Sequence, residues 1–462
     1  MTLIKSISGI RGTIGGKPGD ALTPVDAVKF AAAYGMWVKS RKGKKVVIGR
    51  DARLSGEMIS SLVSNTLLGL GLDVIDLGLS TTPTVEVAVP IEKAGGGIIL
   101  TASHNPIQWN ALKLLNEKGE FISADDGAEV LKIAAQESFD FASVEKLGKY
   151  QHKKGYIAKH IELILKNKLV DVKAIKKAKF KIVVDAVNST GGIAVPDLLE
   201  ELGVKKIKKL YCEPTGKFPH NPEPLPENIK AISTTVRVEG FDLGIVVDPD
   251  VDRLALVCED GKPFGEEYTL VAVADYVLSR KKGNTVSNLS STRALRDVTE
   301  QAGGKYTASA VGEVNVVNEM KRVKAVIGGE GNGGVIFPEL HYGRDALMGI
   351  ALFLTHLAKL NLTASQLRKT YPEYFISKNK IELTPQIDVD KVLAEVEAKY
   401  QHEKVNTIDG VKIDFEQEKE WVHLRKSNTE PIIRIYAESQ NEKKADELAK
   451  RIMGDIRDVA GI

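Results

Sequence analysis

The hydrophobic and polar positions of this chain follow two alternating periods. Short apolar runs typical of buried strands, at residues 44–48 and 73–77, alternate with amphipathic stretches typical of helices. Ser55 precedes one such stretch and is a residue type that favours a helix N-cap. Strands and helices that alternate at this spacing predict a mostly parallel, doubly wound sheet in the first part of the chain.

The same alternation then begins again twice. Further strands are predicted at residues 180–185, 241–247, 285–289 and 325–328. From about residue 371 the pattern changes to helices beside short strand-like stretches, which indicates an α+β domain. We therefore expect three doubly wound α/β domains and one C-terminal α+β domain, with bounds at 1–150, 151–254, 255–370 and 371–462.

The predicted first domain contains a polar loop that follows an apolar strand. Residues 101–106 read Thr-Ala-Ser-His-Asn-Pro after the apolar run 95–100. Ser103 is therefore expected at the carboxyl end of a strand, where open α/β sheets bind ligands. Taken alone, this loop fits an ordinary polar turn as well as it fits a reactive serine.

Three aspartates follow the apolar strand predicted at 241–247. Asp248, Asp250 and Asp252 bring three carboxylates close together in the chain, and two such charges at 4 Å repel by about 4 kcal/mol at an effective dielectric of 20. A cation must compensate if they converge, and oxygen ligands alone favour Mg²⁺ or Ca²⁺ over zinc. Arg253 stands where a calcium EF-hand needs glycine, which excludes that motif. The alternative is a solvated acidic turn.

Two further loops carry polar chemistry. Residues 329–334 match G-x-G-x-x-G, but no helix follows and Glu330 would repel a pyrophosphate, so the loop suits sugar hydroxyls better. A flexible glycine turn is the alternative. In the last domain, guanidinium, hydroxyl and amide groups suitable for a phosphate gather around one turn, unless this is a routine polar hairpin. These residues are Arg425, Ser427, Asn428, Thr429 and Arg434.

Three arginines in the first domain are further candidates for binding an anion. They are Arg11, Arg50 and Arg53. Composition changes this picture little, because a formal net charge of +3 gives no strong field for nucleic acid or a membrane. The two cysteines lie far apart, and no apolar run reaches the length of a signal peptide or membrane span. We therefore expect a soluble cytoplasmic protein.

The four loops, in this order, resemble those of the α-D-phosphohexomutase family along essentially the whole chain. The resemblance implies three α/β domains and one α+β domain around a central cleft. It implies that Ser103 carries a phosphoryl group, donates it to a hexose phosphate, and takes the other phosphate back from the resulting bisphosphate. A hexose 6-phosphate and a hexose 1-phosphate are thereby interconverted, with a hexose 1,6-bisphosphate as activator and intermediate.

The resemblance also implies roles for individual residues. Mg²⁺ would be held by the phosphoserine at Ser103 and by Asp248, Asp250 and Asp252, and would neutralise developing charge. The other catalytic positions are Arg11, His104, Lys113 and Arg253, with Lys113 the candidate acid/base. Glu330 and Asn332 would bind the sugar, and the loop from Arg425 would hold the phosphate that is not being transferred.

Two departures from the family pattern bear on the proton and on the sugar. In many relatives the sugar loop reads Glu-x-Ser-Gly-His, and that His helps to transfer a proton, whereas Asn332 and Gly334 replace Ser and His here. Another residue must then handle the proton, and His341 is one candidate. The sequence Thr-Glu-Pro at 429–431 is similar to phosphoglucosamine mutases, although Asn428 is not. We therefore expect glucosamine phosphate to be slightly preferred over glucose or mannose phosphate.

Two other functions share part of this pattern. A metal-dependent phosphatase with a serine nucleophile would use the same serine and aspartates, but would be expected to have zinc-binding histidines beside them. A sugar-phosphate-binding protein without catalysis would explain the missing His at Gly334.

Overall fold

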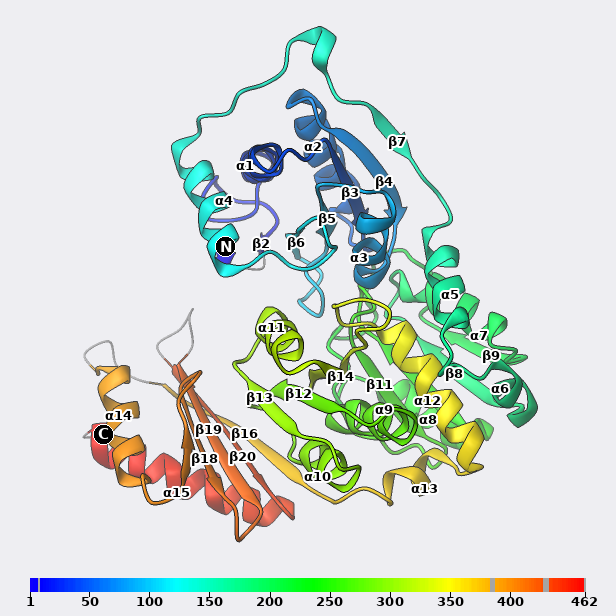
Figure 1. The fold of residues 1–462 in the computed structure, drawn as a ribbon, viewed down its shortest axis with the longest axis vertical. Coiled ribbons are helices and arrows are strands. Elements are labelled where there is room, and N and C mark those ends of the chain that lie inside the picture. The colour runs from blue at the N-terminus through cyan, green and yellow to red at the C-terminus, as the bar shows by residue number, and fades with distance from the viewer. Residues whose placement is uncertain (7–8, 383–386, 427–431, 461–462) are drawn as a thin grey trace.

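The computed structural model describes residues 1–6, 9–382, 387–426 and 432–460 of the chain. They form four sheets with their helices, and Figure 1 shows the four units grouped around a common centre. Three units are α/β and the last is α+β, as the sequence predicts. Within the described residues, no helix is long and apolar enough to cross a membrane.

The first sheet has seven strands in the order β1-β2-β6-β5-β3-β4-β7. Its strands are β1 (Leu3–Ser6), β2 (Gly9–Thr13), β3 (Lys45–Arg50), β4 (Asp73–Leu79), β5 (Gly96–Leu100), β6 (Trp109–Leu115) and β7 (Tyr150–His152). The accompanying helices are α1 (Pro24–Ser40), α2 (Gly56–Gly69), α3 (Thr82–Ile91), α4 (Ala124–Gln136) and the short 3₁₀ turn η1 (Val144–Lys146). Strands β3, β4, β5 and β7 pair in parallel, whereas β1, β2 and β6 add an antiparallel half. The sheet is therefore mixed rather than mostly parallel.

Antiparallel pairing in that half brings candidate site residues to one edge. Lys113 on β6 lies opposite Ile99 on β5 and Gly9 on β2, and Arg11 lies opposite Ala111. Gly9 is required there, because a Cβ at this position would lie 2.2 Å from the carbonyl oxygen of Leu112.

Ser55 is the N-cap residue of helix α2, as predicted, but its side chain does not cap the helix. Ser55 makes no side-chain cap bond to α2, and its hydroxyl instead accepts a hydrogen bond from Asn110 Nδ2 at 2.8 Å. Helices α1 and α4 do begin with complete capping boxes, at Thr23 with Asp26 and at Ser123 with Asp126. A tertiary partner has therefore taken the Ser55 hydroxyl away from its own helix.

The second sheet has the strand order β11-β10-β8-β9, with only the β10–β11 pair antiparallel. Its elements are α5 (Tyr156–Lys166), α6 (Val172–Ala178), β8 (Lys181–Asp185), α7 (Gly191–Glu201), β9 (Lys206–Leu210), α8 (Lys230–Glu239), β10 (Leu243–Val247) and β11 (Leu254–Cys258). The third sheet has the order β13-β12-β14-β15, with the last pair antiparallel.

The third unit supplies two long helices and the sugar loop. Its elements are α9 (Glu266–Arg280), β12 (Asn284–Asn288), α10 (Ala294–Gln301), β13 (Tyr306–Ser309), α11 (Glu313–Val323), β14 (Ala325–Glu330), β15 (Gly334–Ile336), α12 (Ala346–Leu360) and α13 (Ala364–Arg368). The domain bounds expected from the sequence stay a prediction. Strand β11 begins at residue 254 and belongs to the second sheet, and β7 begins at residue 150 and belongs to the first.

The fourth unit is an antiparallel sheet with two helices, in the order β16-β20-β19-β18-β17. Its elements are β16 (Phe375–Glu382), α14 (Val389–Lys399), β17 (Lys404–Asn406), β18 (Val411–Phe415), β19 (Glu420–Lys426), β20 (Ile432–Ser439) and α15 (Glu442–Ala460).

One hydrophobic core runs through both the second and the third unit. Leu198 on α7, Ile245 on β10, Val273 on α9 and Phe353 on α12 are buried in the same cluster. The first and fourth units have cores of their own. Because shared apolar burial opposes separation, we expect the second and third units to move together.

Candidate active site

The serine loop has an uncommon backbone conformation that hydrogen bonds hold in place. Ser103 follows β5 and has a φ of 48°, in the left-handed region that non-glycine residues rarely adopt. Its backbone N–H donates to Thr101 Oγ1 at 2.9 Å, and the Thr101 hydroxyl donates to Asp51 at 2.6 Å. Such strain persists where surrounding structure fixes it, and it is common at functional sites.

Arg53 forms hydrogen bonds with the backbone of the same loop. The Arg53 side chain is fully buried, pairs with Asp51 at 3.0 Å, and donates to the carbonyl oxygens of Ser103, Asn105, Pro106 and Trp109 at 2.6 to 2.9 Å. All of its donors are thereby used inside the protein. The suggestion that Arg53 binds an anion is therefore wrong.

The other first-domain candidate for an anion, Arg50, is also engaged within the protein. Its guanidinium contacts Glu57 at 3.1 Å and the carbonyl oxygen of Asp51 at 3.3 Å.

The three aspartates converge between β10 and β11. Each is fully buried, and one oxygen from each lies within 4.8 Å of the other two. Asp248 Oδ1 accepts the backbone N–H groups of Asp252 and Arg253, and its Oδ2 accepts the Ser103 hydroxyl at 2.7 Å. The serine of the first unit and the acidic loop of the second thus meet.

Asp250 is bound at the start of helix α3. The backbone N–H of Thr82 donates to the Asp250 carbonyl oxygen at 2.8 Å, and the Thr82 hydroxyl donates to its carboxylate at 2.5 Å. A carboxylate at a helix N-terminus is favoured by the helix dipole and by unpaired N–H groups. This contact ties the acidic loop to the first unit at a second point.

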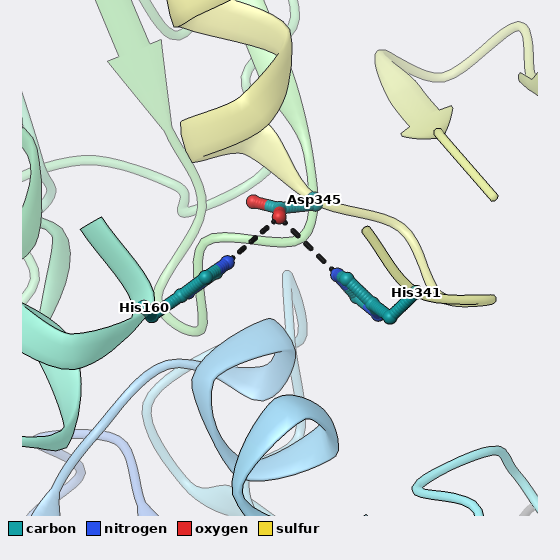
Figure 2. A group of neighbouring side chains, drawn as sticks. All are labelled: His160, His341 and Asp345. Atoms are coloured by element: carbon teal, nitrogen blue, oxygen red, sulfur yellow. Dashed lines mark hydrogen bonds and ion pairs between the residues drawn. The ribbon is translucent and has the colours of Figure 1, made fainter. Parts of the chain in front are cut away.

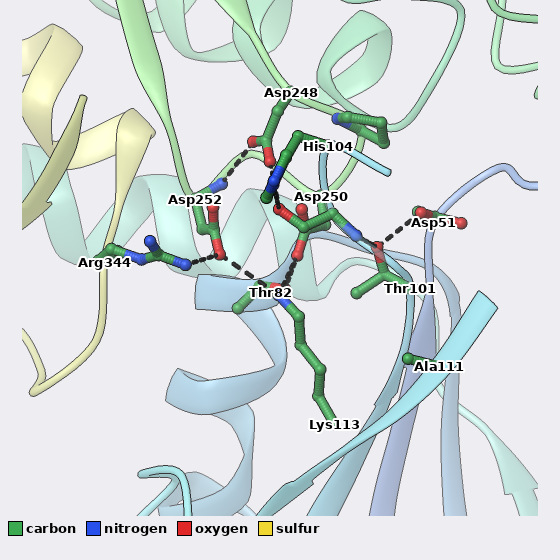
Figure 3. Close-up of polar contacts among 12 residues, drawn as sticks. Asp51, Thr82, Thr101, His104, Ala111, Lys113, Asp248, Asp250, Asp252 and Arg344 are labelled. Atoms are coloured by element: carbon green, nitrogen blue, oxygen red, sulfur yellow. Dashed lines mark hydrogen bonds and ion pairs between the residues drawn. The ribbon is translucent and has the colours of Figure 1, made fainter. Parts of the chain in front are cut away.

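Two cations compensate part of the buried negative charge (Figure 3). Lys113 Nζ lies 2.7 Å from Asp250 and 3.3 Å from Asp252, and Arg344 lies 2.7 Å from Asp252. Burial would lower the pKa of Lys113, but the two aspartates raise it above its usual range. Burial likewise opposes ionisation of Asp252, yet Arg344 and Lys113 hold its pKa below the usual range. For Asp248, burial and the other two aspartates raise the pKa well above normal.

The donor set of this acidic loop fits a magnesium ion. Asp250 Oδ1 and Asp252 Oδ1 are buried and have no hydrogen-bond partner among the described residues. An unpaired buried carboxylate oxygen is costly, so these atoms are poised to bind a cation. All three side chains offer oxygen, which is the ligand that Mg²⁺ prefers.

Three arginines and a histidine line a cavity of about 440 Å³ together with Ser103; they are Arg11, Arg253, Arg344 and His104. Arg11 donates to Asn105 Oδ1 at 2.9 Å, and Arg253 contacts Glu223 at 3.4 Å. The Nε of Arg253 is buried and has no hydrogen-bond partner in the described part of the chain. Burial and the charge of Arg253 lower the pKa of Arg11. Burial and the same arginine lower the pKa of His104 to about 2, so His104 is neutral at physiological pH. The guanidinium groups of Arg11 and Arg253, which line this cavity beside Ser103, suit a phosphoryl group.

A second cavity of about 450 Å³ adjoins the first and is lined by all four units. Arg11, His104, Arg253, Glu330 and Arg344 line both cavities, so the two form one cleft. From the fourth unit the cleft receives Lys378, His423, Arg425, Arg434 and Tyr436. The central cleft implied by the sequence resemblance is therefore present.

The predicted sugar and phosphate residues lie in this second cavity where they are described. Glu330 accepts from Asn288 Nδ2 at 2.8 Å and pairs with Arg344 at 2.9 Å. Asn332 lines the cavity, as do Arg425, which pairs with Asp409 at 2.9 Å, and Arg434. The remaining candidates of the fourth loop, Ser427, Asn428 and Thr429, lie outside the described residues.

His341, the suggested proton carrier, lies elsewhere. It contacts Asp345 at 3.2 Å and Glu86 at 3.3 Å, and His160 contacts the same oxygen of Asp345 at 3.0 Å. Figure 2 shows both imidazole rings pointing at this carboxylate. His341 does not line the two cavities of the described cleft. It therefore belongs to a buried network between the first, second and third units, not to the proposed reaction centre.

Sequence reasoning missed several residues that line the cleft. Arg344 is not among the candidates that the sequence gives, yet its guanidinium contacts Asp252, Glu330 and Glu313. Glu223, in a proline-rich connection, lies beside Arg253. The sequence signal that could have marked Arg344 is an arginine just before an N-cap aspartate at the end of a strand-to-helix loop.

These features define a class of protein: four α/β or α+β units around a cleft that holds a serine, three buried aspartates and several arginines. Four family models match the chain in order, described as phosphoglucomutase/phosphomannomutase alpha/beta/alpha domains I, II and III and C-terminal domain. They cover residues 3–141, 156–261, 265–374 and 381–454. The chain belongs to the phosphoglucomutase/phosphomannomutase family, a group of phosphohexomutases, which confirms the resemblance inferred from the loops.

Individual relatives agree along the whole chain. A phosphoglucomutase/phosphomannomutase of Thermococcus kodakarensis is 38% identical, over 94% of this chain and 96% of its own. A probable phosphoglucosamine mutase of Pyrococcus furiosus is 33% identical, over 98% and 97%. Among solved structures, a phosphoglucomutase/phosphomannomutase family protein of Burkholderia thailandensis superposes with a TM-score of 0.85 at 26% identity, covering 99% of this chain and 97% of that one.

Proposed function

We propose that this protein is a Mg²⁺-dependent phosphohexomutase that works through a phosphorylated Ser103. The observation that carries the proposal is the contact of Ser103 Oγ with Asp248 at 2.7 Å, at the point where three buried aspartates meet a cavity containing Arg11 and Arg253. A hydroxyl in this position can carry a phosphoryl group between cations on both sides. Membership of the family supports the same activity.

The proposed reaction has two balanced halves. In the first, the bond between phosphorus and Ser103 Oγ breaks while phosphorus bonds to a free hydroxyl oxygen of the hexose phosphate. The hydroxyl loses its proton and Ser103 Oγ gains one. In the second half, the other phosphate of the bisphosphate returns to Ser103 by the reverse events. Lys113 lines the cavity beside Ser103. It is proposed to donate its ammonium proton to Ser103 Oγ and then, as the neutral amine, to take up the proton that the sugar hydroxyl loses.

Each part of the described cleft has a proposed task. Asp248, Asp250 and Asp252, with a phosphoserine oxygen, would hold Mg²⁺, which when bound supplies positive charge to the phosphoryl group. Arg11 and Arg253 orient the phosphoryl oxygens by bidentate hydrogen bonds.

The sugar and its second phosphate are assigned to the other cavity. Glu330 and Asn332 are proposed to accept and donate hydrogen bonds to the sugar hydroxyls, and Arg425 and Arg434 to bind the distant phosphate.

Glucosamine phosphate is the proposed preferred substrate, with glucose or mannose phosphate as the alternative. The sequence Thr-Glu-Pro at residues 429–431, which is similar to phosphoglucosamine mutases, supports this choice. Relatives named as phosphoglucosamine mutases support this choice, although the relative that is 38% identical has the other name. A cytoplasmic location is also proposed, since both cysteines are unpaired.

The test is a comparison of rates on glucosamine, glucose and mannose 6-phosphates with Mg²⁺ and a trace of glucose 1,6-bisphosphate. We expect the corresponding 1-phosphate to form, most rapidly from the amino sugar, and we expect Ser103→Ala to lower the rate by orders of magnitude. Ser61→Ala, on the exposed face of α2, is the matched control and should keep wild-type activity.

Three results would overturn parts of the proposal. Full activity of Ser103→Ala would refute the phosphoserine. Release of inorganic phosphate without isomerisation would identify a phosphatase. Tight binding of hexose phosphate without turnover would identify a binding protein.

A further inference from the structure

The space that a side chain at position 334 would need is filled by the side chain of Arg344. A Cβ at position 334 would lie 2.4 Å from Arg344 Cδ and 3.1 Å from its Cγ, far inside contact distance. Gly334 does not have a positive φ, so its backbone conformation does not call for glycine. Space is therefore the reason for glycine at this position: its missing side chain leaves the channel through which Arg344 reaches the cleft.

The guanidinium of Arg344 joins two loops that have different proposed tasks. Its Nη2 lies 2.7 Å from Asp252 Oδ2 in the acidic loop, and its Nη1 lies 2.9 Å from Glu330 Oε2 in the sugar loop. Its Nε lies 3.1 Å from Glu313 at the start of α11. Nη1 and Nη2 thus each hydrogen-bond a different carboxylate, whereas Nε lies near Glu313 without forming a hydrogen bond among the described residues. Since a guanidinium is a rigid planar fork, these contacts fix Asp252 and Glu330 relative to each other.

Burial makes this bridge strong and specific. Arg344 is 8% exposed, and Asp252 and Glu330 are 0% and 4% exposed. Removing one partner from a buried ion network leaves carboxylates that are neither paired nor hydrated, which is far more damaging than losing a surface pair. A lysine would keep the charge, but its single ammonium cannot span three carboxylates as the fork does.

We propose that Arg344 is a positioning residue for the sugar, able to reach its place only because residue 334 is glycine. It holds Glu330 at a fixed distance from Asp252, so that the carboxylate assigned to the sugar hydroxyls is aligned with the loop assigned to the metal. Arg344 keeps its proton at any physiological pH, so it contributes charge and geometry but exchanges no proton. This inference rests on the proposed function and deepens it, because it assigns a residue to sugar alignment.

The test is a double-mutant cycle read by binding as well as by turnover. Arg344→Gln removes the bridge, whereas Gly334→Ala leaves the arginine in the chain but blocks its path. We expect each to weaken binding of the hexose 6-phosphate, measured calorimetrically, by about tenfold or more, and to lower kcat. Combining them should add less than about twofold to Arg344→Gln alone, because the added methyl group has no arginine left to displace.

Controls separate this role from general destabilisation. Gly454→Ala places a methyl group in open space on α15, and Arg322→Gln removes an exposed arginine that pairs with Glu319. Both should bind and turn over like the wild type. Arg344→Lys should recover only part of the affinity. If Arg344→Gln does not fold, Gly334→Ala and Arg344→Lys decide the question in its place.

Two outcomes would overturn the inference. One is wild-type affinity for hexose phosphate in Arg344→Gln or Gly334→Ala at a temperature where each is folded. The other is a full additive loss in the double variant. Failure of the proposed function itself would look different, because the wild type would then bind hexose phosphate without interconverting it while the variants still bound it more weakly.

Discussion

A buried histidine between two carboxylates should make the stability of this protein depend strongly on alkaline pH. His341 is held by Asp345 and Glu86, while Asp345 also accepts from His160 and caps helix α12 through the N–H groups of Leu347 and Met348. Burial alone would lower the pKa of His341, but these two carboxylates raise it to about 10. Deprotonation therefore removes the cation that joins three units.

The sign and size of the effect follow from linkage. A group whose pKa is higher in the folded than in the unfolded state stabilises fully below its unfolded pKa and loses that contribution as pH rises through its folded pKa. For His341 the window runs from 6.5 to about 10. At 1.36 kcal/mol per pH unit, the contribution amounts to at most roughly 5 kcal/mol. Burial raises the pKa of Glu86 to about 8, and this changes stability in the same direction.

The assay is urea unfolding of the wild type and His341→Gln between pH 6 and pH 11. We expect the wild type to be several kcal/mol more stable than the variant near pH 6, and the difference to shrink to about zero above the folded pKa of His341. His402→Gln, at an exposed site, is the control and should follow the wild type throughout. A constant difference between wild type and His341→Gln across this range would refute the reasoning.

Three further predictions concern the candidate site. Arg53→Lys should lower the free energy of unfolding by about 3 kcal/mol or more in urea titrations, because four carbonyl oxygens and Asp51 lose the fork that binds them; an unchanged urea midpoint would contradict this. Mg²⁺ should raise the thermal midpoint of the wild type, by the equivalent of about 2.7 kcal/mol at a hundredfold excess over Kd, but not that of Asp250→Ala; equal shifts in both would exclude this loop as the metal site. Ser103→Gly should be about 1 kcal/mol more stable than Ser103→Ala in urea, because only glycine relieves the positive φ; the opposite order would show that the loop is not strained.

The parts of the fold that the sequence predicts correctly are those that local pattern controls. Apolar runs identify β3, β5, β8 and β10, and the polar residues that follow β5 and β10 identify the serine and aspartate loops. What local pattern does not contain is the pairing between distant segments. Strands β1 and β2 are short, and β2 contains two glycines, so they give no periodic signal. Yet β1 pairs antiparallel with β2, and β2 pairs antiparallel with β6, which places Arg11 and Lys113 beside the serine.

Side chains whose partners lie far away in the sequence were also misjudged. Serine is a residue type that often caps a helix through its hydroxyl, but the hydroxyl of Ser55 accepts a hydrogen bond from Asn110 instead. Arginine is a residue type that often binds anions, but the guanidinium of Arg53 donates its hydrogen bonds to carbonyl oxygens of the serine loop. In both cases residue type predicts a capacity for hydrogen bonding correctly, and tertiary contacts decide which partner uses it.

Gly334 and Arg344 show how the loss of a side chain at one position can be compensated at another. Read alone, Gly334 removes the histidine expected to move a proton. In the structure the vacated space holds the stem of Arg344, which brings permanent positive charge to Asp252 and Glu330. A guanidinium cannot take over proton transfer, and His341 faces Glu86 and Asp345 rather than the cleft. The proposed site therefore separates two tasks that one histidine could combine: Arg344 supplies fixed charge and alignment, and proton exchange is assigned to Lys113 beside the serine.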